Sequence, residues 1–97
     1  MERFSKLVPA EEERLWNLVE EMGEALQAIG KIGRHGYGSR HPEGGPDNRE
    51  ILEKELGHVL YSIRAMAIKY DIEWTKIETA MKMKKESIKP YLHHQLG

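Results

Sequence analysis

Apolar residues recur at steps of three and four along three stretches of the chain, and this spacing predicts three amphipathic helices. The first stretch predicts a helix over residues 9–32, with Pro9 in its first turn and Gly33 as its stop. The second predicts a helix over residues 48–70, and the third a helix that Asp71 caps and Pro90 ends. The apolar positions are Leu15, Leu18, Val19, Met22, Leu26 and Ile29, then Leu52, Leu56, Val59, Leu60, Ile63, Met66 and Ala67, then Trp74, Ile77, Met81 and Ile88. No run alternates as a strand does, so we expect an all-α fold.

A glycine-rich loop separates the first two predicted helices. Residues 33–48 hold five glycines and two prolines without any period, and we place the loop at 33–47. Asp47, followed three residues later by Glu50, resembles a capping box at the start of the second helix. The chain of 97 residues makes a single domain, 1–97, with its core at about 9–89. Because so short a chain supplies half a bundle, we expect a helical hairpin plus a third helix that assembles as a four-helix-type bundle in a homodimer.

The composition of the chain limits the binding partners and the cellular compartment that we expect. The formal net charge of −1 does not indicate a nucleic-acid or membrane partner. The chain has no cysteine, which excludes a disulfide framework, and it lacks the ~18 apolar residues of a spanning helix. No apolar leader segment opens the sequence, so we expect a cytoplasmic protein. Residues 11–24 are mostly acidic and residues 82–89 mostly basic. This distribution suits a site that binds both cations and anions, and it equally suits two charged helix faces exposed to solvent.

Four side chains of types that can bind a metal ion lie beside the apolar stripes of the first two predicted helices. At 100° per residue, Glu21 and Glu24 lie on one flank of the first apolar stripe, and Glu55 and His58 lie on a flank of the second. In an antiparallel hairpin these flanks can meet. Carboxylates brought together repel one another, and a divalent cation removes that repulsion. Oxygen ligands suit Mg²⁺ or Mn²⁺, and an imidazole favours Mn²⁺ or another transition metal. Ordinary ion pairs and a hydrogen-bonded histidine at the core edge would explain the same residues.

Two motifs resemble those of a known superfamily. The segment "LVEEMGEALQAIGK" followed by "LEKELGHVLYSI" is similar to the all-α nucleoside triphosphate pyrophosphohydrolases, the MazG-like proteins, whose pattern is E-E-x-x-E on one helix and E-x-x-D on the next. The loop between them resembles that of short phage-type members, and the likeness covers roughly residues 11–89. It implies a helical dimer or tetramer that uses Mg²⁺ to hydrolyse an NTP or dNTP to the monophosphate and pyrophosphate. Glu21, Glu24 and Glu55 would then be metal ligands, with Glu20 and Glu21 as the catalytic residues and Glu20 supporting the metal or orienting the water.

His58 departs from this pattern, because it stands where the family has an aspartate. A neutral imidazole lacks the charge and hard oxygen that Mg²⁺ prefers, so either the metal preference moves towards Mn²⁺ or activity is lost. A bundle with Glu-x-x-His also suits a di-iron carboxylate protein, and a nucleotide-binding protein without turnover is a third alternative.

The phosphate chain of a nucleotide would need cations besides the metal. The candidates for substrate binding are Arg34 and Arg40 in the loop and Lys82 and Lys85 on the third helix. Tyr37, between two glycines, could stack on a base. A connector with incidental charges would also explain the loop.

Overall fold

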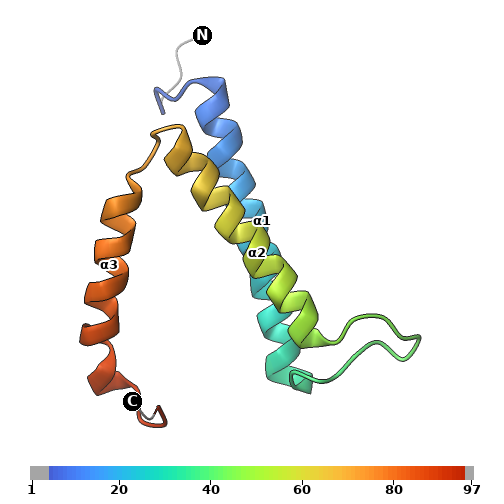
Figure 1. Cartoon of the computed structure of the whole chain (residues 1–97). Coiled ribbons are helices and arrows are strands. Elements are labelled where there is room, and N and C mark those ends of the chain that lie inside the picture. Colours follow the sequence, from blue (N-terminus) through green and yellow to red (C-terminus); the bar gives the residue numbers. More distant parts are fainter. Residues whose placement is uncertain (1–4, 96–97) are drawn as a thin grey trace.

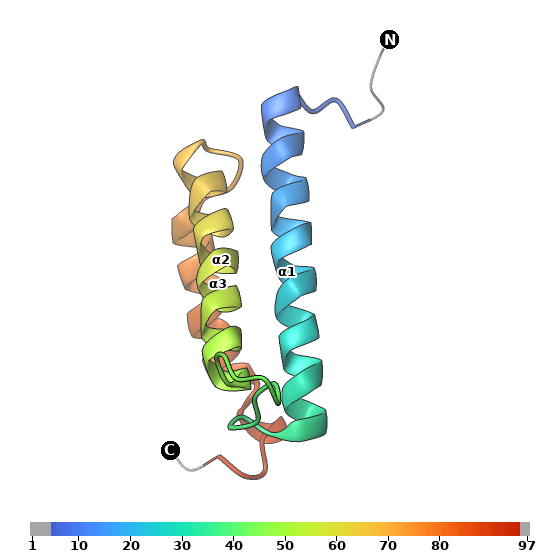
Figure 2. The same cartoon turned by 90° about the vertical axis from the view of Figure 1, so that its right-hand side faces the viewer.

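The chain folds into helices joined by loops. The computed structural model describes residues 5–95, which form α1 (Pro9–His35), α2 (Asn48–Ile68), α3 (Trp74–Ser87) and a 3₁₀ turn, η1 (Lys89–Tyr91). Within this range no strand forms beyond one isolated bridge in the loop, so the all-α prediction is confirmed. In Figure 1 α1 lies behind α2 and α3 stands apart on the left, and Figure 2 shows α1 and α2 side by side as a hairpin. The ends of the predicted domain, 1–4 and 96–97, lie outside the described residues.

Local capping explains where the hairpin helices begin. Pro9 occupies the first turn of α1, and the Val8 N–H donates to a carboxylate oxygen of Glu11 at 2.9 Å. At the start of α2 the Glu50 N–H donates to Asp47 Oδ1 at 2.9 Å, and the Asp47 N–H donates to Glu50 Oε1 at 3.3 Å. This reciprocal pair is a capping box, as predicted from the sequence.

The helix ends differ from the predicted ones. Gly33 does not stop α1, which continues to His35; Gly36 ends it with φ 86° and an N–H that donates to Ile32 O. Glycine costs a helix some stability without breaking it, so Gly33 can stay helical, whereas Gly36 takes a backbone conformation with φ 86° and ψ 169° that favours glycine. The second helix ends at Ile68 rather than 70, and the third at Ser87, with Pro90 in η1.

A Schellman motif closes α2, although it lacks glycine. The Asp71 N–H donates to Met66 O and the Tyr70 N–H donates to Ala67 O, at 2.9 and 3.1 Å. Tyr70 takes the left-handed position with φ 63°. The prediction that Asp71 caps α3 is wrong, because the N-cap residue is Glu73. The Asp71 carboxylate instead accepts two hydrogen bonds from Arg14, from Nε at 2.6 Å and from Nη2 at 2.9 Å. This bidentate pair ties the start of α1 to the end of α2.

The contact between α1 and α2 is narrow and partly polar. The side chains buried in it are Ala25 and Ala28 from α1 and Glu55, Ser62 and Met66 from α2. Two alanines let the helices approach closely at the level of Glu55. The cluster flank predicted from the sequence is therefore the surface on which the hairpin closes.

The apolar stripes of the hairpin remain open. Seven large apolar side chains are 39% to 67% exposed: Leu15, Val19, Met22, Leu26, Ile29, Leu56 and Leu60. On each helix the stripe lies about 100° from the contact face in the same rotational sense. Because the two helices are antiparallel, the stripes share one side of the hairpin, which we call the open apolar face. The chain exposes 8391 Å², whereas a folded monomer of 11.2 kDa should expose about 5,700 Å².

The third helix makes little contact with the hairpin. None of its residues is buried, and one described link is the Arg64 guanidinium, 3.8 Å from the centre of the Trp74 ring. In Figure 2, α3 lies behind α2 and away from α1. Among the residues described, no helix combines the length and apolar character needed to cross a bilayer.

Candidate metal centre

Four side chains converge midway along the hairpin. Glu21 and Glu24 project from α1 and Glu55 and His58 from α2, and one ligand atom of each lies within 4.8 Å of the others. We call this group the Glu₃His cluster. The short side chains of Ala25 and Ala28 bring the two helix backbones together beside it. The structure thus places the four residues that the sequence singled out next to one another.

The centre of the Glu₃His cluster is poorly neutralised. His58 Nδ1 lies 3.4 Å from Glu21 Oε2 and 3.7 Å from Glu55 Oε2, and Lys54 Nζ lies 3.4 Å from Glu55 Oε1. Glu55 is only 7% exposed. Oε2 of Glu21 and Oε2 of Glu55 are buried and accept no hydrogen bond from the described residues. Buried carboxylate oxygens without donors are costly, so the site has an unmet need for positive charge.

Proximity of the acids also perturbs protonation. A hydrogen bond to Glu55 raises the pKa of Glu24, and desolvation and the negative charge of Glu21 raise it further. The raised pKa of Glu24 indicates that the neighbouring carboxylates repel one another when all of them are ionised. Three carboxylates and an imidazole form a donor set that fits a divalent cation, with the histidine favouring Mn²⁺ over Mg²⁺.

Glu20 and the α3 lysines lie apart from the cluster in this protomer. Glu20 is exposed on α1, outside the group of converging atoms, and acts on Glu24 through its charge. Lys82 and Lys85 are exposed on the separate α3. Neither lysine lines a cavity described beside the Glu₃His cluster.

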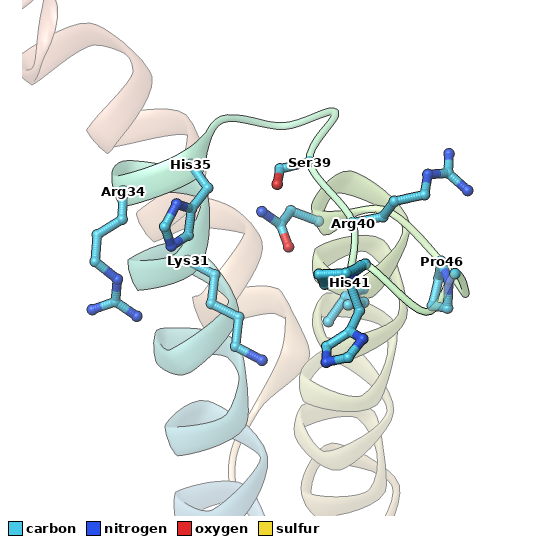
Figure 3. Close-up of a pocket in the computed structure, with 11 residues that line it drawn as sticks. Lys31, Arg34, His35, Ser39, Arg40, His41 and Pro46 are labelled. Atoms are coloured by element: carbon cyan, nitrogen blue, oxygen red, sulfur yellow. The ribbon is translucent and has the colours of Figure 1, made fainter.

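The residues of the loop region that the sequence offered for substrate binding do not point towards one common space. Arg34 and Arg40 both line a cavity of about 520 Å³ under the loop, but Figure 3 shows their side chains pointing away from each other. Arg40 Nη1 donates to Gly45 O at 3.0 Å, so it helps to hold the loop. The guanidinium of Arg49 lies 5.0 Å from the centre of the Tyr37 ring, so one face of that ring already has a cation beside it.

Several residues around the cluster were missed in the sequence. Lys31 and Lys54 line a cavity of about 350 Å³ that also reaches Glu24, Glu55 and His58. Tyr61 lines a cavity of about 240 Å³ on the other side, with Asn17, whose amide donates to Ser62 Oγ at 2.8 Å. The spacing of Lys31, seven residues after Glu24, could have revealed it, because i and i+7 share a helix face.

Comparison of the chain with protein-family models, curated proteins and solved structures gives no match. The resemblance to the MazG-like proteins therefore rests on the two motifs and their loop, and the argument for function rests on the geometry of the Glu₃His cluster.

Proposed function

We propose that the protein is a metal-dependent nucleoside triphosphate pyrophosphohydrolase that converts an NTP or dNTP and water to the monophosphate and pyrophosphate. The observation that supports this proposal is the Glu₃His cluster, in which Glu21 and Glu55 each keep a buried oxygen without a hydrogen-bond donor. Such oxygens suit a divalent cation, Mg²⁺ or Mn²⁺. Two open cavities of about 240 and 350 Å³ are lined by residues of the cluster and leave room for a ligand beside it.

The chemistry follows from the roles of the carboxylates. Glu21, Glu24, Glu55 and His58 would hold the cation, which when bound would supply positive charge to the phosphates and make water more acidic. The water oxygen forms a bond to the α-phosphorus while the bond from that phosphorus to the α,β-bridging oxygen breaks. Pyrophosphate leaves, and the water proton passes to a carboxylate of the E-E-x-x-E motif, Glu20 or Glu21.

Turnover is the direct test. A panel of NTPs and dNTPs is incubated with Mg²⁺ and with Mn²⁺, and the monophosphate and pyrophosphate are measured. Glu21→Gln should abolish release, whereas Glu13→Gln, an exposed glutamate of the same helix, should leave it unchanged. Absence of turnover for every nucleotide with either metal, at high protein concentration, would contradict the proposal.

His58 favours one alternative enough to test it. Its Nδ1 lies near two carboxylates, as a Glu-x-x-His ligand of a di-iron bundle would. Residues 5–95 of one protomer supply a single Glu₃His cluster, so a di-iron centre would need a second copy. Anaerobic loading with Fe²⁺ followed by oxygen should then give oxo-bridge absorption. A colourless, iron-free product removes this alternative.

We also propose that a second copy of the chain covers the open apolar face and completes a four-helix bundle. The surface in excess of a compact monomer is about 2,700 Å², and stable homodimers commonly bury 2,000 Å² or more. The charges of the helices are complementary: residues 9–24 carry six glutamates against Arg14, and α3 carries Lys76, Lys82, Lys84 and Lys85 against two glutamates. A partner's α3 could therefore bring Lys82 and Lys85 to the acidic helix.

Sedimentation equilibrium tests the second copy. The wild type should have at least twice the protomer mass, and Leu26→Glu, which buries a charge at the centre of the open apolar face, should reduce that mass. Gln27→Glu makes the same charge change one residue away, on another side of α1, and should not. A monomeric wild type at tens of micromolar would refute the assembly.

A further inference from the structure

The cavity under the glycine-rich loop has an unusual lining. It measures about 520 Å³ and lies where the end of α1 meets the start of α2 (Figure 3). Its lining includes five basic side chains, Lys31, Arg34, His35, Arg40 and His41, and none of the described residues that line it is acidic. In a chain of net charge −1, basic side chains are thus gathered beside the acidic Glu₃His cluster. One of them, Arg40, is partly paired, because its Nη2 lies 3.9 Å from Asp47 Oδ2.

Orientation identifies which basic groups can act together. In Figure 3, Lys31 from α1 and His41 from the loop point towards the same space between the two helices, while Arg34 and Arg40 point outwards on opposite sides. His35 lies on the α1 side of this space. A ligand between the helices would therefore face Lys31 and the histidines, whereas the charged ends of the two arginines point away from this space.

The tautomer of His41 is set by the backbone. The Glu43 N–H donates to His41 Nδ1 at 3.1 Å, so a neutral ring carries its proton on Nε2. His41 thus offers an N–H donor whether it is neutral or charged. The loop around it is held by Gly44 N–H to His41 O at 2.9 Å and by the buried Asn48 amide, which donates to Gly36 O at 3.0 Å. These hydrogen bonds hold the loop backbone around His41 in place.

The cavity adjoins the Glu₃His cluster. Lys31 and Ile51 line both the loop cavity and the 350 Å³ cavity that contains Glu24, Glu55 and His58. Lys54 lies on the same path. A chain of negatively charged groups could extend from the cluster past Lys31 to His41 and meet a cation or donor at each step.

We propose that the loop cavity is a polyphosphate subsite, in which Lys31, His35 and His41 bind the terminal phosphates of the substrate and then the released pyrophosphate. The identity of the substrate rests on the proposed function; the binding of a polyphosphate anion does not. The subsite would orient the nucleotide with its α-phosphate at the Glu₃His cluster and its terminal phosphates under the loop.

Calorimetric titration with inorganic pyrophosphate, without metal, tests this subsite. Lys31→Gln and His41→Ala should each weaken binding at least about tenfold, as loss of a charged or strong hydrogen bond does. The matched control is Lys76→Gln on α3, whose lysine pairs with Glu73 at 3.8 Å and should not affect the affinity. Unchanged affinity in both cavity variants would overturn the proposal.

The same variants separate this proposal from the proposed function. If pyrophosphate binding depends on Lys31 but no nucleotide is hydrolysed, the subsite stands and the enzyme proposal fails. If nucleotides are hydrolysed and Lys31→Gln alters neither KM nor pyrophosphate affinity, the enzyme proposal stands and the subsite fails.

Discussion

Replacing Glu55 with glutamine should stabilise the protein when metal is absent and should remove its response to metal. Glu55 is 7% exposed, and its Oε2 accepts no hydrogen bond from the described residues. Glutamine keeps the shape, removes one negative charge and adds an amide donor that can reach Glu21 or Glu24.

The magnitude follows from the spacing of the acids. The ligand atoms of Glu21 and Glu55 lie within 4.8 Å of each other, and two unit charges at that distance repel by about 1.7 to 3.5 kcal/mol at an effective dielectric constant of about 20 to 40. The neighbouring His58 offsets part of this. We therefore expect Glu55→Gln to raise the free energy of unfolding in EDTA by about 1 to 2 kcal/mol, or the Tm by about 4 to 8 °C per kcal/mol.

Metal should make the wild type more stable than Glu55→Gln, the reverse of their order in EDTA. At Mn²⁺ one hundred times above its Kd, the wild type gains about 2.7 kcal/mol, and the variant gains little. Thermal unfolding at fixed protein concentration, in EDTA and in Mn²⁺, measures both effects. Glu53→Gln, an exposed neighbour on α2, is the control and should respond to Mn²⁺ like the wild type. A variant with a lower Tm in EDTA and an undiminished Mn²⁺ shift would refute the reasoning.

Three further predictions use single substitutions. His58→Asp should raise turnover and affinity in Mg²⁺ relative to Mn²⁺, because it adds a hard anionic oxygen; an unchanged metal preference would show that His58 is not a ligand. Tyr70→Gly should stabilise the protein by about 1 kcal/mol in urea unfolding, because Tyr70 holds φ 63° while 92% exposed, whereas Tyr70→Ala should not. The Arg14 guanidinium holds the pKa of Asp71 below its usual range, so the contribution of this pair to stability is present above pH ~4 and is lost as pH falls through the folded pKa. Asp71→Asn should therefore lower stability at pH 7 but less so near pH 2, and a difference that is constant with pH would contradict this assignment.

Local rules predicted the elements of the fold well. Helical periodicity located α1, α2 and α3, and the Asp47–Glu50 pair correctly marked the start of α2. The helix ends were missed by a few residues for local reasons, but one error came where a distant residue decides the outcome. Asp71 has the right chemistry for a cap, but Arg14, 57 residues earlier, takes its carboxylate. A sequence pattern cannot weigh that competition.

The Glu₃His cluster could be predicted from the sequence because its residues lie on regular helices, whereas the lining of the loop cavity could not. Glu21, Glu24, Glu55 and His58 follow helix periodicity, so their shared flank could be inferred once an antiparallel hairpin was assumed. The basic lining of the loop cavity depends on how a glycine-rich segment folds back over two helix ends. Arg34 and Arg40 were the expected cations, and the backbone instead turns His41 inwards.

The open apolar face also determines which substitutions should change the stability of an isolated protomer. In an isolated protomer, slow amide hydrogen exchange should centre on the turns that contain Ala25, Ala28 and Ser62, where α1 and α2 touch, rather than on the leucine-rich turns. Enlarging one of these small residues would force the helices apart, whereas exchanging Leu26 would alter the protomer itself very little. In this chain the most hydrophobic positions mark a surface, and the small and charged positions mark the interior.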